Sequence, residues 1–264
     1  GKGGFIAENQ TLIIGQTDYY VATQGDDGNP GTLAEPFRTI QKFADIAYPG
    51  DTCYIRAGTY RETVTPVRSG NAVYPITMRA YNGETVTING ADIIEGGWSL
   101  HSGSIYKTSA MTWNMGTGEN QIYADGVVLM EARWPNSTDL ADSQWSLLDG
   151  YTRYSSSDYG FTDSDLPDLD WVGAVMRYTI PGYWAFSGIV SSCGTGTIRV
   201  DAHTDVPSEY RDQLAGAAYY IIGALAALDT AGEWFYDTST GTLYLWAPGS
   251  VDPSILTVEA KARD

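Results

Sequence analysis

The segment PGDTCYIRAGTYRET, residues 49–63, holds a short strand rich in β-branched and aromatic residues between two turns. No hairpin partner follows this strand at once, so its two edges need partners from elsewhere in the chain. In the segment before it, EPFRTIQKFADIA, Phe37, Ile40 and Phe43 recur at helical spacing, and Pro49-Gly50 ends the pattern. The sequence therefore predicts a helix over 36–47 and a strand over 53–56 that is paired non-locally.

A parallel solenoid would supply the missing partners, because each strand in it pairs with the equivalent strand of the next coil. Further short strands with irregular spacing are expected at 19–23, 76–80 and 86–89, and no two-residue hairpin joins them. The first coil would expose unpaired backbone and the end of an apolar core, which the apolar face of helix 36–47 is suited to cover. A β-sandwich with one helix is the alternative, and the pattern alone does not separate the two.

The sequence pattern changes near Gly96-Gly97-Trp98, where longer loops begin and the expected strands alternate apolar and polar residues. IYADGVVL is typical of a hairpin that turns at Asp125-Gly126, and GEWFYDTSTGTLYLWAPG (232–249) contains two alternating strands about a TSTG turn. We expect four parts: a leader (1–17), a cap with first coils (18–96), an inserted antiparallel domain (97–228), and a return hairpin that resumes the solenoid (229–264).

Charge and cysteine content exclude several classes of protein. A net charge of −17 repels phosphate backbones and anionic lipids, so neither nucleic acid nor a membrane surface is an expected partner. Hydrophobic residues make up 43% of the chain, which is enough for a sizeable core. Cys53 and Cys193 make no disulfide framework, and Cys53 is expected to be a small buried hydrophobe. The low charge and abundant Tyr, Thr, Ser and Gly predict a secreted, extracellular protein.

Two sets of motifs resemble a known family. Residues 19–90, with a helix followed by PGDT, RAGTY and PIT-x-RAYNGE in order, resemble the N-terminal cap and first coils of right-handed parallel β-helix proteins. These form the pectate-lyase-like group, which includes glycoside hydrolases and polysaccharide lyases. QIYADGVVLMEARWPN and LDTAGEWFYDTSTGTLYLWAPG resemble the paired signatures of β-helix glycosidases that interrupt the solenoid with an early β-rich insert. Ala231 departs from the proline common at that position.

The resemblance implies an all-β fold: the N-terminal portion of a right-handed parallel β-helix with a capping helix, plus an inserted antiparallel β-sandwich or barrel-like domain. It also implies the N-terminal part of a secreted, polysaccharide-degrading glycoside hydrolase. The catalytic carboxylates of such enzymes lie on later coils, so no catalytic residue is assigned here. Three alternatives stay open: a glycan-binding or adhesive module, a polysaccharide lyase, and an assembly protein whose open C-terminal coil stacks on a second chain or on itself.

Glycoside hydrolysis needs two carboxyl groups at a defined separation. Asp229, Glu233 and Asp237 cluster in the return segment, and Glu131 precedes the ARWPN motif. In a chain with 32 acidic residues such clusters arise by chance, so we expect solvated or turn-capping roles for them. Asp237, followed by Thr-Ser-Thr-Gly, is expected to initiate a turn.

Aromatic content points to a polysaccharide or oligosaccharide partner. The chain has 8 Trp and 19 Tyr but only 6 Phe, and rings with a polar tip suit stacking on sugars when they are exposed. The candidate substrate-binding residues are those near turn signals: Trp134, Trp145, Tyr183 and Trp184. Packing in a β-rich core is the alternative for each of them.

No cofactor is expected from the motifs. Asp26, Asp27 and Asn29 in GDDGNPG could offer oxygen ligands to Ca²⁺, but the loop lacks the spaced ligand series of a dedicated calcium site. The loop is therefore expected to form a tight turn, with Ca²⁺ binding as the alternative, and no metal-ligating residue is assigned.

Overall fold

A computed structural model of the chain describes residues 16–116, 120–137, 144–180, 184–202 and 205–263. The chain divides into two compact units, one of residues 1–92 with 263–264 and one of residues 93–262. The four-part division expected from the sequence stays a prediction. No described helix is long and apolar enough to cross a membrane.

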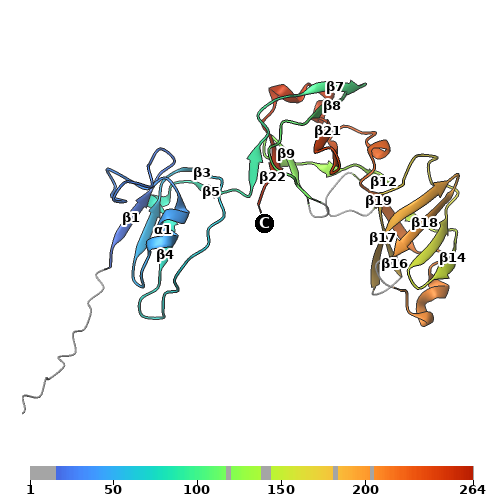
Figure 1. Cartoon of the computed structure of the whole chain (residues 1–264), viewed down its shortest axis with the longest axis horizontal. Coiled ribbons are helices and arrows are strands. Elements are labelled where there is room, and N and C mark those ends of the chain that lie inside the picture. Colours follow the sequence, from blue (N-terminus) through green and yellow to red (C-terminus); the bar gives the residue numbers. More distant parts are fainter. Residues whose placement is uncertain (1–15, 117–119, 138–143, 181–183, 203–204, 264) are drawn as a thin grey trace, which may run out of the picture. The chain divides into compact units, whose positions relative to one another are not determined.

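The first unit is built on parallel strands (Figure 1). Strands β1 (Asp18–Val21), β2 (Thr52–Ile55) and β4 (Thr77–Ala80) form one parallel sheet, in which Cys53 lies opposite Tyr19 on one side and Met78 on the other. Strands β3 (Gly58–Tyr60) and β5 (Val86–Ile88) form a second parallel pair. The non-local pairing predicted for the strand around Cys53 is confirmed, and the antiparallel sandwich alternative is wrong for this unit.

Helix α1 (Ile40–Ile46) packs its apolar face into the same unit. The Thr39 hydroxyl accepts the Lys42 N–H, and the Glu62 carboxylate accepts the N–H groups of Ile40 and Gln41 at 3.0 and 2.8 Å. These bonds satisfy donors that a helix start leaves open. Ile40, Phe43 and Ala44 are buried, and Ile40 and Phe43 join a cluster with residues of β1 and β2. Closure of the first coil by this helix stays a prediction.

Cys53 and Cys193 are expected to differ sharply in reactivity. Cys53 is fully buried in that cluster, and burial raises the pKa of its thiol to about 12, whereas Cys193 is partly exposed. Because the thiolate is the reactive form, N-ethylmaleimide should modify Cys193 in the native protein and reach Cys53 only after unfolding. Peptide mass spectrometry with and without denaturant checks this, with Cys193→Ser as the control. Equal labelling of both thiols in the native protein would contradict the buried position of Cys53.

A small sheet has the strand order β10-β9-β22-β6, in which β9, β10 and β22 belong to the second unit and β6 spans the boundary between residues 92 and 93. Strands β9 (Ile122–Ala124) and β10 (Val127–Val128) form the predicted hairpin, and Asp125 and Gly126 both have positive φ, at 49° and 77°. The other two strands are β22 (Val258–Lys261) and β6 (Ala91–Ile93).

The end of the chain differs from the sequence expectation. Instead of resuming a parallel solenoid, β22 pairs antiparallel with β9, with Val258 opposite Ala124. Val258 and Ala260 alternate into a core that also buries Ile122, so this register places the apolar face of β22 inward.

A five-stranded sheet of order β11-β20-β21-β8-β7 follows. The expected return hairpin is β20 (Glu233–Asp237) with β21 (Thr242–Trp246), and Asp237 starts its turn by accepting the Ser239 N–H and the Ser239 and Thr240 hydroxyls. These bonds lower the pKa of Asp237. The sheet is completed by β11 (Met130–Glu131), β8 (Ile105–Thr108) and β7 (Ser99–Ser102).

The rest of the second unit is one antiparallel sheet of order β12-β19-β16-β17-β18-β15-β14, with β13 also paired to β19. Large side chains on one face, among them Tyr159, Tyr178 and Tyr219, are fully buried in a common core. The predicted antiparallel pairing is confirmed for these strands, and their arrangement as a sandwich or barrel-like domain stays a prediction. Their bounds are β12 (Arg133–Trp134), β13 (Ser146–Leu147), β14 (Gly150–Ser155), β15 (Asp158–Thr162), β16 (Val175–Ile180), β17 (Trp184–Gly194), β18 (Thr197–Ala202) and β19 (Ala218–Ile222).

Short 3₁₀ helices connect several of these strands. Their bounds are η1 (Tyr81–Gly83), η2 (Ser208–Gln213), η3 (Leu225–Ala227), η4 (Pro248–Ser250) and η5 (Pro253–Ile255).

Candidate functional site

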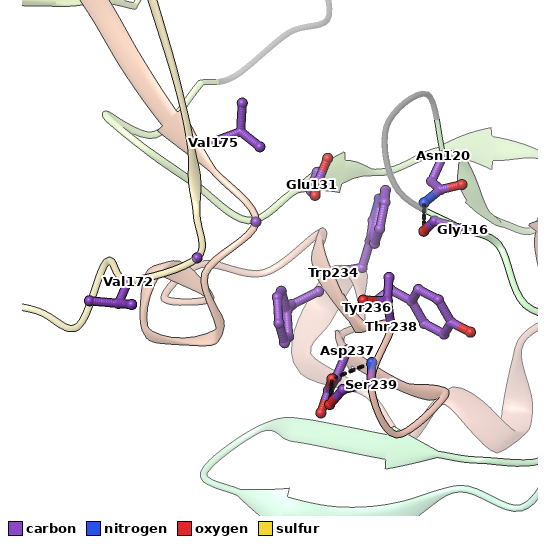
Figure 2. A pocket seen from close by; sticks show the side chains of 13 residues that line it. Gly116, Asn120, Glu131, Val172, Val175, Trp234, Tyr236, Asp237, Thr238 and Ser239 are labelled. Carbon is purple, nitrogen blue, oxygen red and sulfur yellow. Dashed lines mark hydrogen bonds between the residues drawn. The ribbon is translucent and has the colours of Figure 1, made fainter. Parts of the chain in front are cut away.

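A cavity of about 440 Å³ lies within the second unit (Figure 2). This volume is in the range of small-molecule sites in proteins. Strand β20 and its turn supply one wall with Trp234–Ser239, and β11 supplies Glu131. The remaining lining residues come from loops and from the start of β16: Gly116, Asn120, Val172, Gly173, Val175 and Gly223.

The wall formed by β20 is aromatic and held in place. Trp234 is buried, and its indole N–H donates to the carbonyl of Leu129 at 3.2 Å. The Tyr236 hydroxyl donates to Asn114 Oδ1 at 3.2 Å, and Phe235 packs 6.0 Å from the Tyr244 ring. Phe235 keeps some exposure, unlike the two aromatic residues beside it. Because side chains alternate along a strand, Trp234 and Tyr236 point to one face of β20 and Phe235 to the other, so Phe235 is the ring of these three that a ligand can reach.

Glu131 is one of the polar groups that line this cavity. It lies opposite Trp234 in the parallel pairing of β11 with β20, and Figure 2 shows it between Val175 and Trp234. Its carboxyl group forms no hydrogen bond with a described residue. Burial raises its pKa to about 7, against the charge of Arg177, which favours the ionised form. The carboxyl group is thus free for a ligand and changes protonation near neutral pH.

Two glycines keep the loop side of the cavity open. Gly173 and Gly223 have φ of 87° and 79°, a region that residues with a side chain rarely adopt. A Cβ added at Gly223 would lie 3.6 Å from Glu131 Oε1. A residue with a side chain at this position would therefore strain the backbone, while its Cβ would only touch the carboxyl group.

Glu233, the first residue of β20, carries a second carboxyl group that is withdrawn from solvent. Only 2% of the residue is exposed, and neither carboxyl oxygen has a hydrogen-bond partner among the described residues. Burial first, and then the charge of Asp229, raise its pKa to about 8. Arg133 opposes the shift, as do the N–H groups of Asp229 and Thr230, which lie near the carboxylate without reaching hydrogen-bonding geometry.

The solvated or turn-capping roles expected for Glu131 and Glu233 are therefore wrong, while the turn role of Asp237 is confirmed. The two glutamates lie on adjacent strands inside the unit, and β11 has only two residues, too few for a sequence pattern. One feature of the sequence could have indicated that these two glutamates lie within strands. Each glutamate directly adjoins strand-forming apolar residues, in VVLMEA and GEWFY.

The aromatic residues singled out from the sequence do not line this cavity. Trp134 is partly buried 5.7 Å from the Tyr219 ring, and Trp145 meets Tyr220 edge-on at 4.7 Å. Trp184, at the start of β17, is 50% exposed and lies 6.4 Å from the Tyr210 ring. Tyr183 lies outside the described residues. Of the three described residues, Trp134 and Trp145 lie against neighbouring residues of β19, whereas Trp184 lies beside Tyr210.

The acidic residues of the GDDGNPG loop are engaged in local bonds. Asp26 accepts the Gly28 N–H at 2.8 Å. Asp27 accepts the N–H groups of Arg38 and Thr39 and the Thr39 hydroxyl. These bonds tie the loop to the start of α1. They are the bonds of a turn, as expected from the sequence.

Comparisons with known proteins point to a β-helix family. Residues 19–132 match the model described as "Pel9A-like, right handed beta helix region". The chain is 44% identical over 80 residues to the uncharacterized protein YwoF of Bacillus subtilis and 41% identical over 95 residues to pectate lyase PEL9 of Emericella nidulans. These matches cover 30% and 35% of this chain and 17% and 23% of the relatives.

A solved structure titled glycoside hydrolase shares the fold. It superposes with a TM-score of 0.67 at 19% identity over 92% of this chain and 45% of its own. The chain thus spans less than half of this structure and less than a quarter of the two curated relatives. Residues 19–132 are thus similar to a right-handed β-helix family, and the proteins that resemble this chain include a pectate lyase and a glycoside hydrolase.

Proposed function

We propose that the chain is the N-terminal part of a secreted, polysaccharide-degrading β-helix glycoside hydrolase, and that it binds a sugar unit of the polysaccharide in the Glu131 cavity. The observation that carries this proposal is an unpaired carboxyl group beside a rigid aromatic wall. The similarity of residues 19–132 to a β-helix family and the shared fold support it.

The chemistry of the cavity suits a sugar ring. Aromatic faces pack against the apolar C–H face of a sugar, and the few polar groups of a binding site orient its hydroxyls. Phe235 offers the partly exposed ring, and Glu131 offers the carboxyl group. With its pKa of about 7, Glu131 can donate to a hydroxyl below neutral pH and accept from one above it.

In this proposal the cavity binds a sugar, and cleavage of the glycosidic bond takes place elsewhere in the protein. Hydrolysis needs a second carboxyl group about 5 to 10 Å from the first. Among the described residues, the other carboxylate that lines the cavity is Asp237, which is held by its turn, and the same bonds lower its pKa. We place the catalytic pair on coils beyond residue 264, supported by the small share of the similar proteins that this chain spans.

Glu131→Ala is expected to weaken the binding of neutral oligosaccharides at least about tenfold, because a hydrogen bond to a charged group contributes about 1.5–3 kcal/mol. Isothermal titration calorimetry with a panel of neutral xylo-, gluco- and arabino-oligosaccharides measures the affinity of the wild type and of Glu131→Ala. Glu95→Ala, which removes an exposed carboxylate, serves as the matched control. Unchanged affinity in Glu131→Ala for every sugar that the wild type binds would refute sugar binding by Glu131.

Digestion assays test the catalytic part of the proposal. The 264-residue chain should release no reducing ends from neutral polysaccharides and no unsaturated products from polygalacturonate. Release of reducing ends would show that a catalytic pair lies within the chain. Unsaturated products would favour a polysaccharide lyase instead.

A glycan-binding module is the second candidate, favoured by the 50% exposure of Trp184 next to Tyr210. Loss of oligosaccharide binding in Trp184→Ala, together with full binding in Glu131→Ala, would assign recognition to that end of β17 instead.

A further inference from the structure

The outer face of the eight-stranded sheet continues from the cavity. Side chains alternate along β16, so Met176 and Tyr178 point into the core, while Val175 and Arg177 lie on the opposite face. Val175 lines the cavity, and Arg177, two residues further along, is exposed. A ligand that fills the cavity can therefore extend along this face past Arg177.

Arg177 lies beside an aromatic pair. It is directly opposite Tyr220 of β19 on one side and Ser187 of β17 on the other. The Tyr220 ring is fixed by Trp145, edge-on at 4.7 Å, and by the Arg133 guanidinium, 4.2 Å from its centroid. Tyr220 and Trp145 are both partly exposed, and we call this pair the shelf.

Arg177 has no partner of its own in the described part of the chain. Arg133 donates to the carbonyls of Pro135 and Gln144, and Arg199 on the same sheet pairs with Asp158. Arg177 forms no such hydrogen bond or ion pair with a described residue, although its charge acts on Glu131. Its donors are therefore available to an anionic ligand.

We propose that Arg177 and the shelf form a second subsite that binds a carboxylated sugar next to the neutral sugar held in the Glu131 cavity. This inference rests on the proposed function. A guanidinium donates two parallel N–H groups to a carboxylate, a geometry that a hydroxyl cannot match. The Tyr220 and Trp145 rings supply apolar surface beside that charge.

The net charge of −17 does not oppose this assignment at short range, because charges further than about 8 Å away are screened at physiological ionic strength. Glu131 interacts with the charge of Arg177, and its pKa of about 7 leaves it largely protonated below neutral pH. Asp201 and Asp158 lie on the more distant strands β18 and β15, and Asp158 is paired with Arg199.

The same geometry gives the subsite a pH signature. As pH rises through about 7, Glu131 ionises and competes with the ligand carboxylate for Arg177. Affinity for the carboxylated sugar should fall across that range in the wild type and stay level in Glu131→Gln.

The test is calorimetric titration of the whole chain with a neutral xylo-oligosaccharide and with the same oligosaccharide bearing one glucuronosyl branch. The wild type should bind the branched ligand about tenfold more tightly at a pH below 7. Arg177→Gln should remove that difference and leave affinity for the neutral ligand unchanged. Arg199→Gln, on the same sheet but already paired, should keep the preference.

Other outcomes overturn the inference. Equal affinity of the wild type for both ligands excludes the carboxylate subsite, while binding in the Glu131 cavity, and with it the proposed function, stands. An equal loss for both ligands in Arg177→Gln, with an unchanged circular dichroism spectrum, would show that Arg177 does not select the carboxylate. Binding of neither ligand by the wild type would end both this inference and the proposed function.

Discussion

Trp234→Ala is expected to lower the free energy of unfolding of the second unit by about 3–5 kcal/mol, the usual cost of truncating a buried tryptophan. The side chain is 1% exposed and packs in the core that also holds Leu243 and Leu245 of the neighbouring strand. The change also leaves the Leu129 carbonyl without its indole donor. This carbonyl lies just before β11, so the wall that carries Glu131 should loosen as well.

Urea unfolding followed by far-ultraviolet circular dichroism measures the effect. Trp184→Ala is the matched control, because it removes the same side chain from a site that is 50% exposed and should cost less than about 1 kcal/mol. Equal destabilisation by the two substitutions would contradict the packing of β20.

Glu233→Gln is expected to stabilise the protein at alkaline pH and to change little in acid. Burial raises the pKa of Glu233 from 4.5 to about 8, so the folded state holds a proton that the unfolded state releases. The stabilising contribution is complete below pH 4.5 and is lost as pH rises to about 8. At about 1.4 kcal/mol per pKa unit, the full loss is on the order of 5 kcal/mol. Glutamine keeps the shape of the protonated group and does not ionise.

The measurement is the free energy of urea unfolding at a series of pH values between 4.5 and 8. Wild-type stability should fall across this range, and Glu233→Gln should show a clearly shallower slope. Some slope should remain, because Glu131 titrates at about 7 in the same sheet. Glu95→Gln, at an exposed position, should keep the wild-type slope. Identical slopes in the wild type and Glu233→Gln would show that Glu233 is ionised in the fold.

Local signals explain which elements could be predicted from the sequence. Apolar residues at helical spacing predict helix α1. The hairpin at Asp125-Gly126 is predicted by two residues that tolerate positive φ. The parallel pairing of Cys53 follows from the absence of a local partner for its strand. In each case a few neighbouring residues carry the information.

Long-range pairing explains most of what could not be predicted. The antiparallel pairing of β22 with β9 depends on which core accepts Val258, and no residue near Val258 encodes that choice. The same holds for Glu131, whose partly buried position depends on the pairing of a two-residue strand with β20. Aromatic content likewise does not tell which rings are exposed: Trp134 is partly buried against the core, while Trp184 is half exposed.

Crystals of the chain soaked with a neutral oligosaccharide that it binds in solution test the central claim most directly. Our account predicts density for one sugar ring in the cavity beside Phe235, with a ring hydroxyl within hydrogen-bonding distance of the Glu131 carboxyl group. Density for the sugar only at another surface, such as the one around Trp184, with the cavity free of it, would contradict that account.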